Sequence, residues 1–128
     1  MERVQFQKEY PLNKVSRTAL WRAISMPNGL SEWFCDSVVV DRDTYVFTWK
    51  GFQQKATLIA KQEDEYIRFQ WEEDKATKLF FEMSIAHLEL TGMVGLVVKD
   101  ITEADDIDDS IVLWDSMMER LKRRLGLN

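Results

Sequence analysis

Alternating apolar and polar positions near the start of the chain predict a strand. Over residues 3–10, Val4, Phe6 and Tyr10 fall broadly on one side, while charged and amide side chains fall on the other. This period of two residues is typical of a strand that buries one of its faces. Pro11 follows directly and is expected to end the strand.

Two short helices are predicted after this strand. Asn13 or Ser16 can cap a helix that extends to about Ser25, because the apolar residues in this stretch recur at helical spacing. Pro27 then suits the first turn of a second helix, which we expect to extend to Phe34.

Six further strands are predicted in the middle of the chain. Short apolar stretches alternate there with turn-forming groups of Asp, Gly, Glu and Lys residues. The predicted strands are residues 37–40, 45–50, 55–61, 66–72, 78–88 and 93–101. Their connections are too short for a parallel crossover, so neighbouring strands should pair antiparallel.

Bulky side chains occupy alternate positions in three of these strands. Alternate residues of a strand point to the same face, so each set should share one face of the sheet. The sets are Tyr45, Phe47 and Trp49; Ile67, Phe69 and Trp71; and Leu79, Phe81, Met83 and Ile85.

A long amphipathic helix is predicted over residues 105–125. Its apolar positions step by four, three, four, three and four, and they are Ile107, Ile111, Trp114, Met118, Leu121 and Leu125. Aspartates gather at its start and basic residues at its end, which is the arrangement that the helix dipole favours. We interpret the basic residues in this way rather than as a contact for nucleic acid or membrane.

Length and charge narrow the class of protein. The 128 residues, 45% of them hydrophobic, suit a single globular domain over residues 1–128. The formal net charge of −5 argues against a nucleic-acid partner, which would require a basic face. We expect no membrane-spanning segment, because no run of about eighteen apolar residues occurs. A cytoplasmic location agrees with this and with a single cysteine, Cys35, which can form no internal disulfide.

The order of these elements resembles the helix-grip fold of the START-like (SRPBCC) superfamily. Residues 20–34, LWRAISMPNGLSEWF, are similar to the helix pair of that family, with proline at the break and Trp-Phe at its end. Residues 113–122, LWDSMMERLK, are similar to its closing helix. The likeness is closest to bacterial homologues of the ATPase activator of a heat-shock chaperone. It implies an α+β fold with a curved antiparallel sheet wrapped around the C-terminal helix.

The resemblance also implies an apolar cavity between the sheet and the long helix, in which family members bind lipids or other hydrophobic molecules. The bulky side chains expected on the concave face and on the two helical segments are the candidate ligand-binding residues. They are Trp33, Phe34, Phe47, Trp49, Phe69, Trp71, Phe81, Met83, Trp114 and Met118. The same rings could instead fill the cavity, which would favour a protein-interaction module related to chaperone activators.

Catalytic and metal chemistry have weaker support in the sequence. His87 and Glu89 would share a strand face, so a carboxylate could orient an imidazole, but no third partner is identifiable. Cys35 is best interpreted as a small buried apolar residue. The sequence predicts no catalytic residue, no metal ligand set and no cofactor, and it leaves the oligomeric state open.

Overall fold

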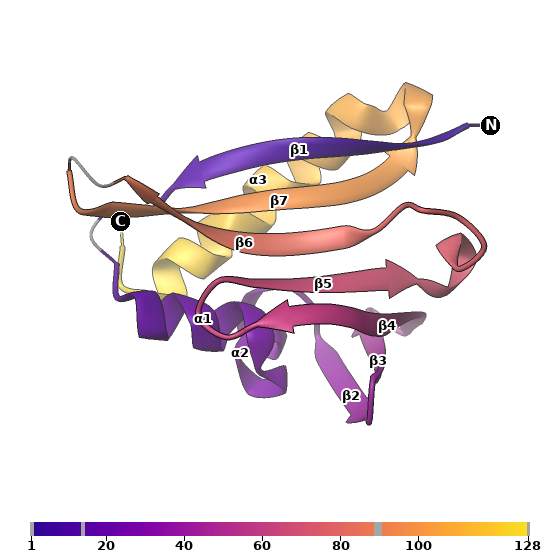
Figure 1. Cartoon of the computed structure of the whole chain (residues 1–128), viewed down its shortest axis with the longest axis horizontal. Helices are drawn as coiled ribbons and strands as arrows, with labels where there is room; N and C mark the ends of the chain where they lie inside the picture. The colour runs from indigo at the N-terminus through magenta and orange to yellow at the C-terminus, as the bar shows by residue number, and fades with distance from the viewer. Residues whose placement is uncertain (1, 14, 89–90, 128) are drawn as a thin grey trace.

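The computed structural model describes residues 2–13, 15–88 and 91–127, and these residues form one curved sheet with three α-helices (Figure 1). The strands are β1 (Arg3–Pro11), β2 (Ser37–Asp41), β3 (Thr44–Trp49), β4 (Phe52–Gln62), β5 (Tyr66–Trp71), β6 (Phe81–Leu88) and β7 (Met93–Glu103). The helices are α1 (Arg17–Ser25), α2 (Pro27–Trp33) and α3 (Ile107–Arg124), with short 3-10 helices η1 (Glu72–Asp74) and η2 (Ala104–Asp106).

The sheet is antiparallel throughout, with the order β1-β7-β6-β5-β4-β3-β2. From β2 to β7 each strand pairs with the next strand along the chain, as the short connections predicted. β1 instead pairs with β7 in a register that joins Arg3 to Glu103 and Pro11 to Gly95. The first and last strands of the chain are therefore neighbours, and the predicted helix-grip α+β fold is confirmed.

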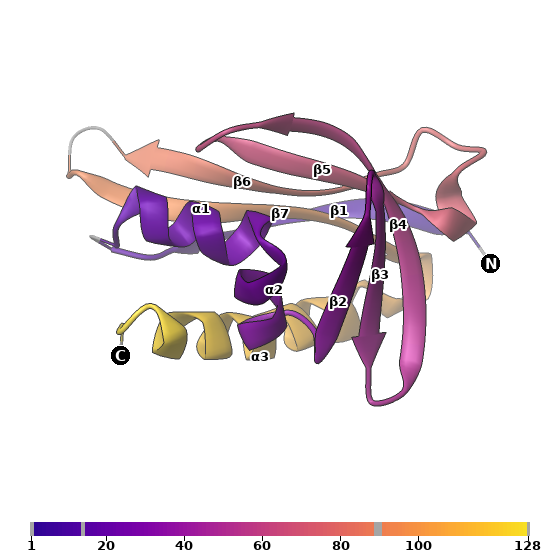
Figure 2. The same cartoon turned by 90° about the horizontal axis from the view of Figure 1, so that it is seen from below.

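A bulge in β4 accompanies the strong bend of the sheet. The pairing of β4 with β5 shifts by one residue between Leu58 and Ala60, and such a bulge increases local bend and twist. Figure 2 shows the consequence, with β2, β3 and the start of β4 turned toward α3 at one end of the sheet. The concave face that results is where the core and α3 lie.

Local chemistry explains the helix pair. Ser16 caps α1, because its hydroxyl accepts a hydrogen bond from the Ala19 N–H at 3.2 Å. Pro27 occupies the first turn of α2, as predicted from its missing N–H. At Gly29 a Cβ atom would collide with the carbonyl oxygen of Arg22, so only glycine lets α2 approach α1 this closely.

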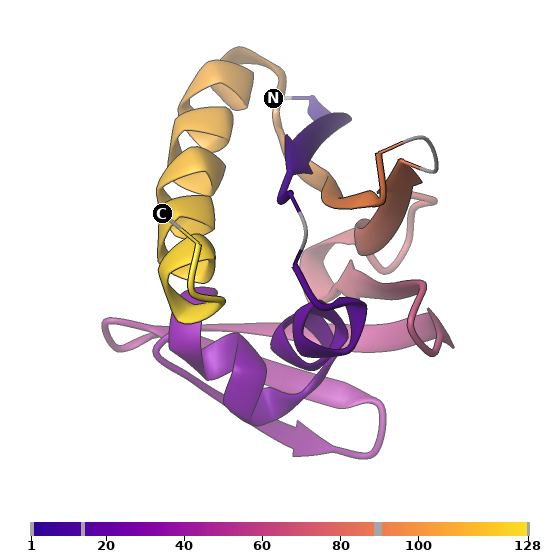
Figure 3. The same cartoon turned by 90° about the vertical axis from the view of Figure 1, so that its left-hand side faces the viewer.

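α3 lies across the concave side of the sheet, and α1 and α2 pack near its C-terminal half (Figures 2 and 3). The predicted positions Trp114, Met118 and Leu121 are buried, whereas Ile107, Ile111 and Leu125 are only partly buried. Met117, which lies beside these positions on the helix, is also buried. None of the helices among the described residues is long and apolar enough to cross a membrane.

Several predicted strand boundaries were wrong. The strand predicted from residue 78 begins at Phe81, and residues 72–74 form η1. Thr77 holds the intervening loop, because its hydroxyl donates to the Asp74 carbonyl at 2.8 Å and accepts from the Leu79 N–H at 3.0 Å. The strand predicted to end at residue 101 continues to Glu103, because its residues from Gly95 to Glu103 pair with β1.

Candidate ligand-binding groove

A groove with a volume of about 380 Å³ lies between α3 and the bent end of the sheet. We call it the aromatic groove. Its residues come from the end of α2, from β3, β4, β5 and β7, and from α3, and they are Phe34, Trp49, Phe52, Gln54, Trp71, Asp100, Ser110, Leu113, Trp114, Met117 and Arg120.

The rings that line the groove are held in place by contacts with one another and with the backbone. The Trp49 indole N–H donates to the Phe34 carbonyl oxygen at 2.6 Å. The ring centroids of Phe34 and Trp49 lie 5.3 Å apart, and those of Phe34 and Trp114 lie 5.6 Å apart. Because Phe34 contacts rings from both the sheet and α3, it fixes the spacing between the two walls.

Three N–H groups bind the carboxylate of Asp100, which lines the groove. Oδ1 accepts from the backbone N–H of Ile101 at 2.8 Å and from the Trp71 indole at 3.3 Å, and Oδ2 accepts from the Trp114 indole at 2.9 Å. Burial raises the pKa of Asp100 above its usual range, while these hydrogen bonds and the guanidinium of Arg3 oppose part of the rise.

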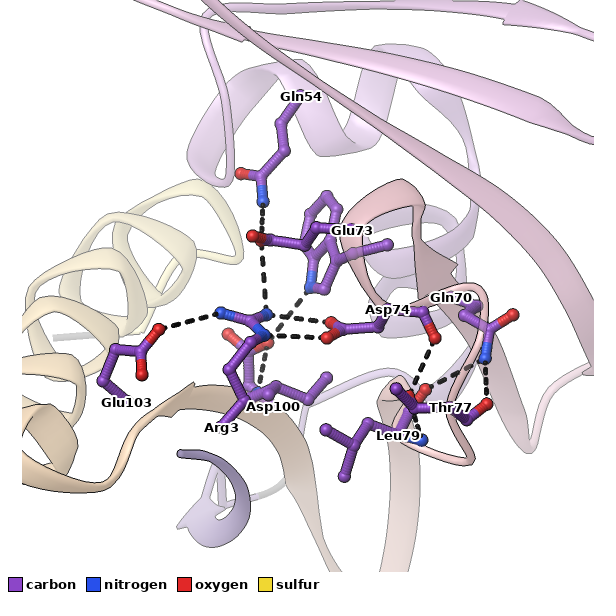
Figure 4. Close-up of polar contacts among 11 residues, drawn as sticks. Arg3, Gln54, Gln70, Glu73, Asp74, Thr77, Leu79, Asp100 and Glu103 are labelled. Atoms are coloured by element: carbon purple, nitrogen blue, oxygen red, sulfur yellow. Dashed lines mark hydrogen bonds and ion pairs between the residues drawn. The ribbon is translucent and has the colours of Figure 1, made fainter. Parts of the chain in front are cut away.

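Arg3 lies next to Asp100, and its guanidinium forms ion pairs with three other acidic side chains (Figure 4). Its guanidinium donates to both carboxylate oxygens of Asp74, at 2.7 and 2.8 Å, and it lies 3.2 Å from Glu73 and 4.0 Å from Glu103. The side chain of Asp74 is 1% exposed, so this pair ties η1 to β1 in a site with little water. The hydrogen bonds that Arg3 donates to Asp74, together with the surrounding carboxylates, raise the pKa of Arg3.

Two apolar side chains of the groove are open to solvent. Phe52 is 64% exposed and Leu113 is 60% exposed, although most large apolar residues in this domain are buried. Phe52 begins β4 and Leu113 lies on α3, so they border the groove from two different elements. Exposed apolar groups around a cavity are typical of a surface that another molecule covers.

The structure separates the ten candidate ligand-binding residues into three groups. Four of them line the aromatic groove, namely Phe34, Trp49, Trp71 and Trp114. Five are almost completely buried within the core, namely Phe47, Phe69, Phe81, Met83 and Met118. Trp33 is buried too, and it borders a second cleft between the short helices and the end of α3.

The second cleft, of about 460 Å³, is larger but more polar. The exposed side chains of Arg124 and Glu32 form an ion pair across it at 2.6 Å, and Arg22 and Asn28 also border it. An apolar molecule placed there would remove water from these charges, which is costly. The aromatic groove is therefore the better candidate site.

Sequence reasoning missed Asp100, Phe52 and Leu113. A signal for Asp100 was present, because it shares the alternation of Leu96 and Val98, which both point into the core. A charged residue at an inward position is uncommon and often functional. Phe52 and Leu113 had no such signal, since their exposure depends on how far the start of β4 lies from α3.

Of the residues considered for catalysis, Cys35 and His87 do not line the groove. Cys35 is 4% exposed, and burial, together with Asp36, raises the pKa of its thiol to about 11. This agrees with a buried apolar role for Cys35. His87 is exposed on β6, and Glu89 lies outside the described residues. Among the described residues no group of three His, Cys, Asp or Glu side chains is placed to hold a metal ion.

Comparison with known proteins agrees with this architecture. The sequence model of the family described as START-like superfamily domain matches residues 1–127 of this chain. A solution structure of BfR322 from Bacteroides fragilis is 41% identical, covers 97% of this chain and 92% of its own, and has a TM-score of 0.66. No protein with a curated description matches the chain significantly.

More distant solved structures share the fold. The Aha1 dimer from Colwellia psychrerythraea is 12% identical with a TM-score of 0.72, and the match covers 98% of this chain and 96% of that one. ChR145 from Cytophaga hutchinsonii is 19% identical with a TM-score of 0.71, and the match covers 98% and 97%. A curved sheet that grips a C-terminal helix defines the helix-grip class of α+β domains. The chain belongs to the START-like superfamily.

Proposed function

We propose that the chain binds a small hydrophobic ligand in the aromatic groove. The observation that carries this proposal is the groove itself, whose volume of about 380 Å³ is bounded by five aromatic side chains. Sites for small molecules commonly have volumes of roughly 300 to 1,000 Å³ and mostly apolar walls with a few polar groups. The START-like superfamily, which often binds hydrophobic ligands, supports the same proposal.

The two exposed side chains at the edge of the groove explain where the free energy of binding would come from. Phe52 and Leu113 each have more than half of their surface in water, and a ligand between them would cover both. Removing apolar surface from water contributes about 25 cal/mol for each Å². The free energy of binding would therefore come largely from the ligand, Phe52 and Leu113 leaving water together.

The walls also need little rearrangement before a ligand binds. The rings of Phe34 and Trp114 contact each other, and the indoles of Trp49 and Trp71 each donate a hydrogen bond, to Phe34 and to Asp100. A site whose side chains are already ordered loses little conformational entropy on binding. The aromatic groove is therefore arranged as a preformed site.

A fluorescence titration with N-phenyl-1-naphthylamine, which is uncharged at neutral pH, tests this proposal. We expect its emission to rise on binding, with a dissociation constant in the micromolar range. Leu113→Gln should weaken binding about tenfold, because it removes roughly 1.4 kcal/mol of apolar contact.

Val112→Gln is the matched control. Val112 neighbours Leu113 on α3 and is 66% exposed, but it does not border the groove. We expect it to leave the affinity unchanged. Absence of binding to the unaltered chain, or an equal loss in both variants, would contradict the proposal.

The second candidate function is docking of an apolar segment of a protein partner on the same side of α3. The observation that favours it is that Val112 and Leu113 are both exposed and adjacent. A protein segment long enough to cover the groove would also contact Val112. Weakened binding of such a partner by Val112→Gln, with unchanged binding of the naphthalene probe, would support this alternative.

A further inference from the structure

We propose that the ligand of the aromatic groove carries a protonated amine, which pairs with the carboxylate of Asp100. This inference rests on the proposed function and specifies the chemical class of the ligand. It follows from three features of the groove. Asp100 has a free acceptor position, the charges around Asp100 are mostly negative, and the walls of the groove are aromatic.

The hydrogen bonds of Asp100 leave room for one more donor. Within the described part of the chain, Oδ1 accepts from both Ile101 and Trp71, whereas Oδ2 accepts from Trp114 alone. A carboxylate oxygen can accept two hydrogen bonds, so Oδ2 has an acceptor position left. Because Asp100 lines the groove, the proposal places the donor of the ligand at this position.

The charges around Asp100 favour a positively charged donor over a neutral one. The carboxylates of Glu73, Asp74, Asp100 and Glu103 face the single guanidinium of Arg3. Arg3 donates its hydrogen bonds to Asp74 rather than to Asp100. Oε2 of Glu103 is buried and accepts no hydrogen bond from the described residues, which adds to the negative potential. A cation bound at Asp100 would reduce this excess of charge.

The aromatic walls suit the same ligand. The indole of Trp49 and the ring of Phe34 border the groove with Trp71 and Trp114. Aromatic rings attract cations through the negative charge on their faces and also pack against apolar groups. A molecule with an ammonium group on an apolar body therefore matches both the walls and Asp100.

The position of Arg120 defines how the ligand would lie. Arg120 also borders the groove, six residues after Trp114 on α3, and six residues rise about 9 Å along a helix. The backbone of Arg120 is thus separated from that of Trp114 along the helix axis, and Met117 lines the wall between them. We infer that the ammonium lies at Asp100 and that the apolar body extends along α3 toward Arg120.

Three probes with one apolar body test the inference: 4-phenylbutylamine, 4-phenylbutan-1-ol and 4-phenylbutanoate. Their affinities can be measured by NMR, using the indole N–H signals of Trp71 and Trp114 as reporters. We expect the amine to bind about tenfold more tightly than the alcohol, and the carboxylate to bind most weakly. Higher salt should weaken binding of the amine but not of the alcohol.

Asp100→Asn should lower the affinity for the amine to that for the alcohol and leave the alcohol unchanged. The control variant is Asp109→Asn, which removes the same charge from an exposed position on α3 outside the groove. If Asp100→Asn does not fold, the unaltered chain answers the question by its pH dependence. The affinity for the amine should fall as Asp100 becomes protonated, while the affinity for the alcohol stays constant.

The outcomes separate this inference from the proposed function. Equal or tighter binding of the alcohol would overturn the inference and leave a hydrophobic site in place. Tightest binding of the carboxylate, lost in Arg120→Gln, would also overturn it and assign the polar anchor to Arg120. Failure of all three probes together with the naphthalene probe would overturn the proposed function itself.

Discussion

The indole N–H of Trp114 lies 2.9 Å from Oδ2 of Asp100 and joins α3 to β7 at the groove. The ring of Trp114 also packs against Trp33, Phe34 and Phe81, so the same side chain belongs to the core and to the wall of the groove. Both the stability of the domain and the shape of the groove therefore depend on Trp114. Substitutions at Trp114 should change both together.

Trp114→Ala should lower the free energy of unfolding by about 3 to 5 kcal/mol, because it leaves a cavity where a 2% exposed ring had been. Urea unfolding followed by circular dichroism measures the change. Val112→Ala, on the exposed side of α3, should change stability by no more than about 0.5 kcal/mol. A loss below about 1 kcal/mol at Trp114 would mean that the ring does not pack as described.

The raised pKa of Asp100 should appear as a pH dependence of stability. The folded state holds the proton of Asp100 to a higher pH than the unfolded chain does. Between the ordinary aspartate pKa of about 3.9 and the raised folded value, the folded state binds more protons, so the free energy of unfolding falls as pH rises.

Comparison with Asp100→Asn isolates this contribution. Urea unfolding of both proteins across the acid range should show the unaltered chain losing stability relative to the variant as pH rises through that window. Above the folded pKa the difference should become constant. A difference that does not vary with pH, or that varies in the opposite direction, would contradict the raised pKa.

Arg3→Met should destabilise the domain by about 3 kcal/mol, because it leaves the Asp74 carboxylate buried without its bidentate partner. Adding Asp74→Asn to this variant should recover part of the loss, since no unpaired charge then remains. Arg123→Met, at an exposed position of α3, provides the control. If the double variant is as unstable as Arg3→Met alone, packing rather than charge explains the effect.

Cys35 should react slowly with Ellman's reagent in the folded protein. A thiol with a pKa of about 11 has very little thiolate near neutral pH, and the side chain is buried. We expect the reaction to be roughly two orders of magnitude slower than in urea, where the pKa returns to about 8.5. A rapid reaction without denaturant would show that the thiol is accessible.

Much of the secondary structure could be predicted from the sequence because each signal is local. The spacing of Trp114, Met118 and Leu121 reports one face of a helix, and Ser16 and Pro27 act within a single helical turn. Alternation in β3 and β5 identified the faces that carry Phe47 and Phe69. Short connections then required antiparallel pairing from β2 to β7.

Apart from the inward position of Asp100, the site needed information that no local pattern contains. Trp71 and Phe69 obey the same alternation, yet Trp71 lines the groove and Phe69 is completely buried, because the path of α3 decides which ring it covers. The bend of β4 similarly sets the exposure of Phe52. The sequence alone determined the elements and their inward faces, since these depend on neighbours along the chain. Only the tertiary structure decided that Asp100 meets two indoles at the groove, because those partners come from separate strands and helices.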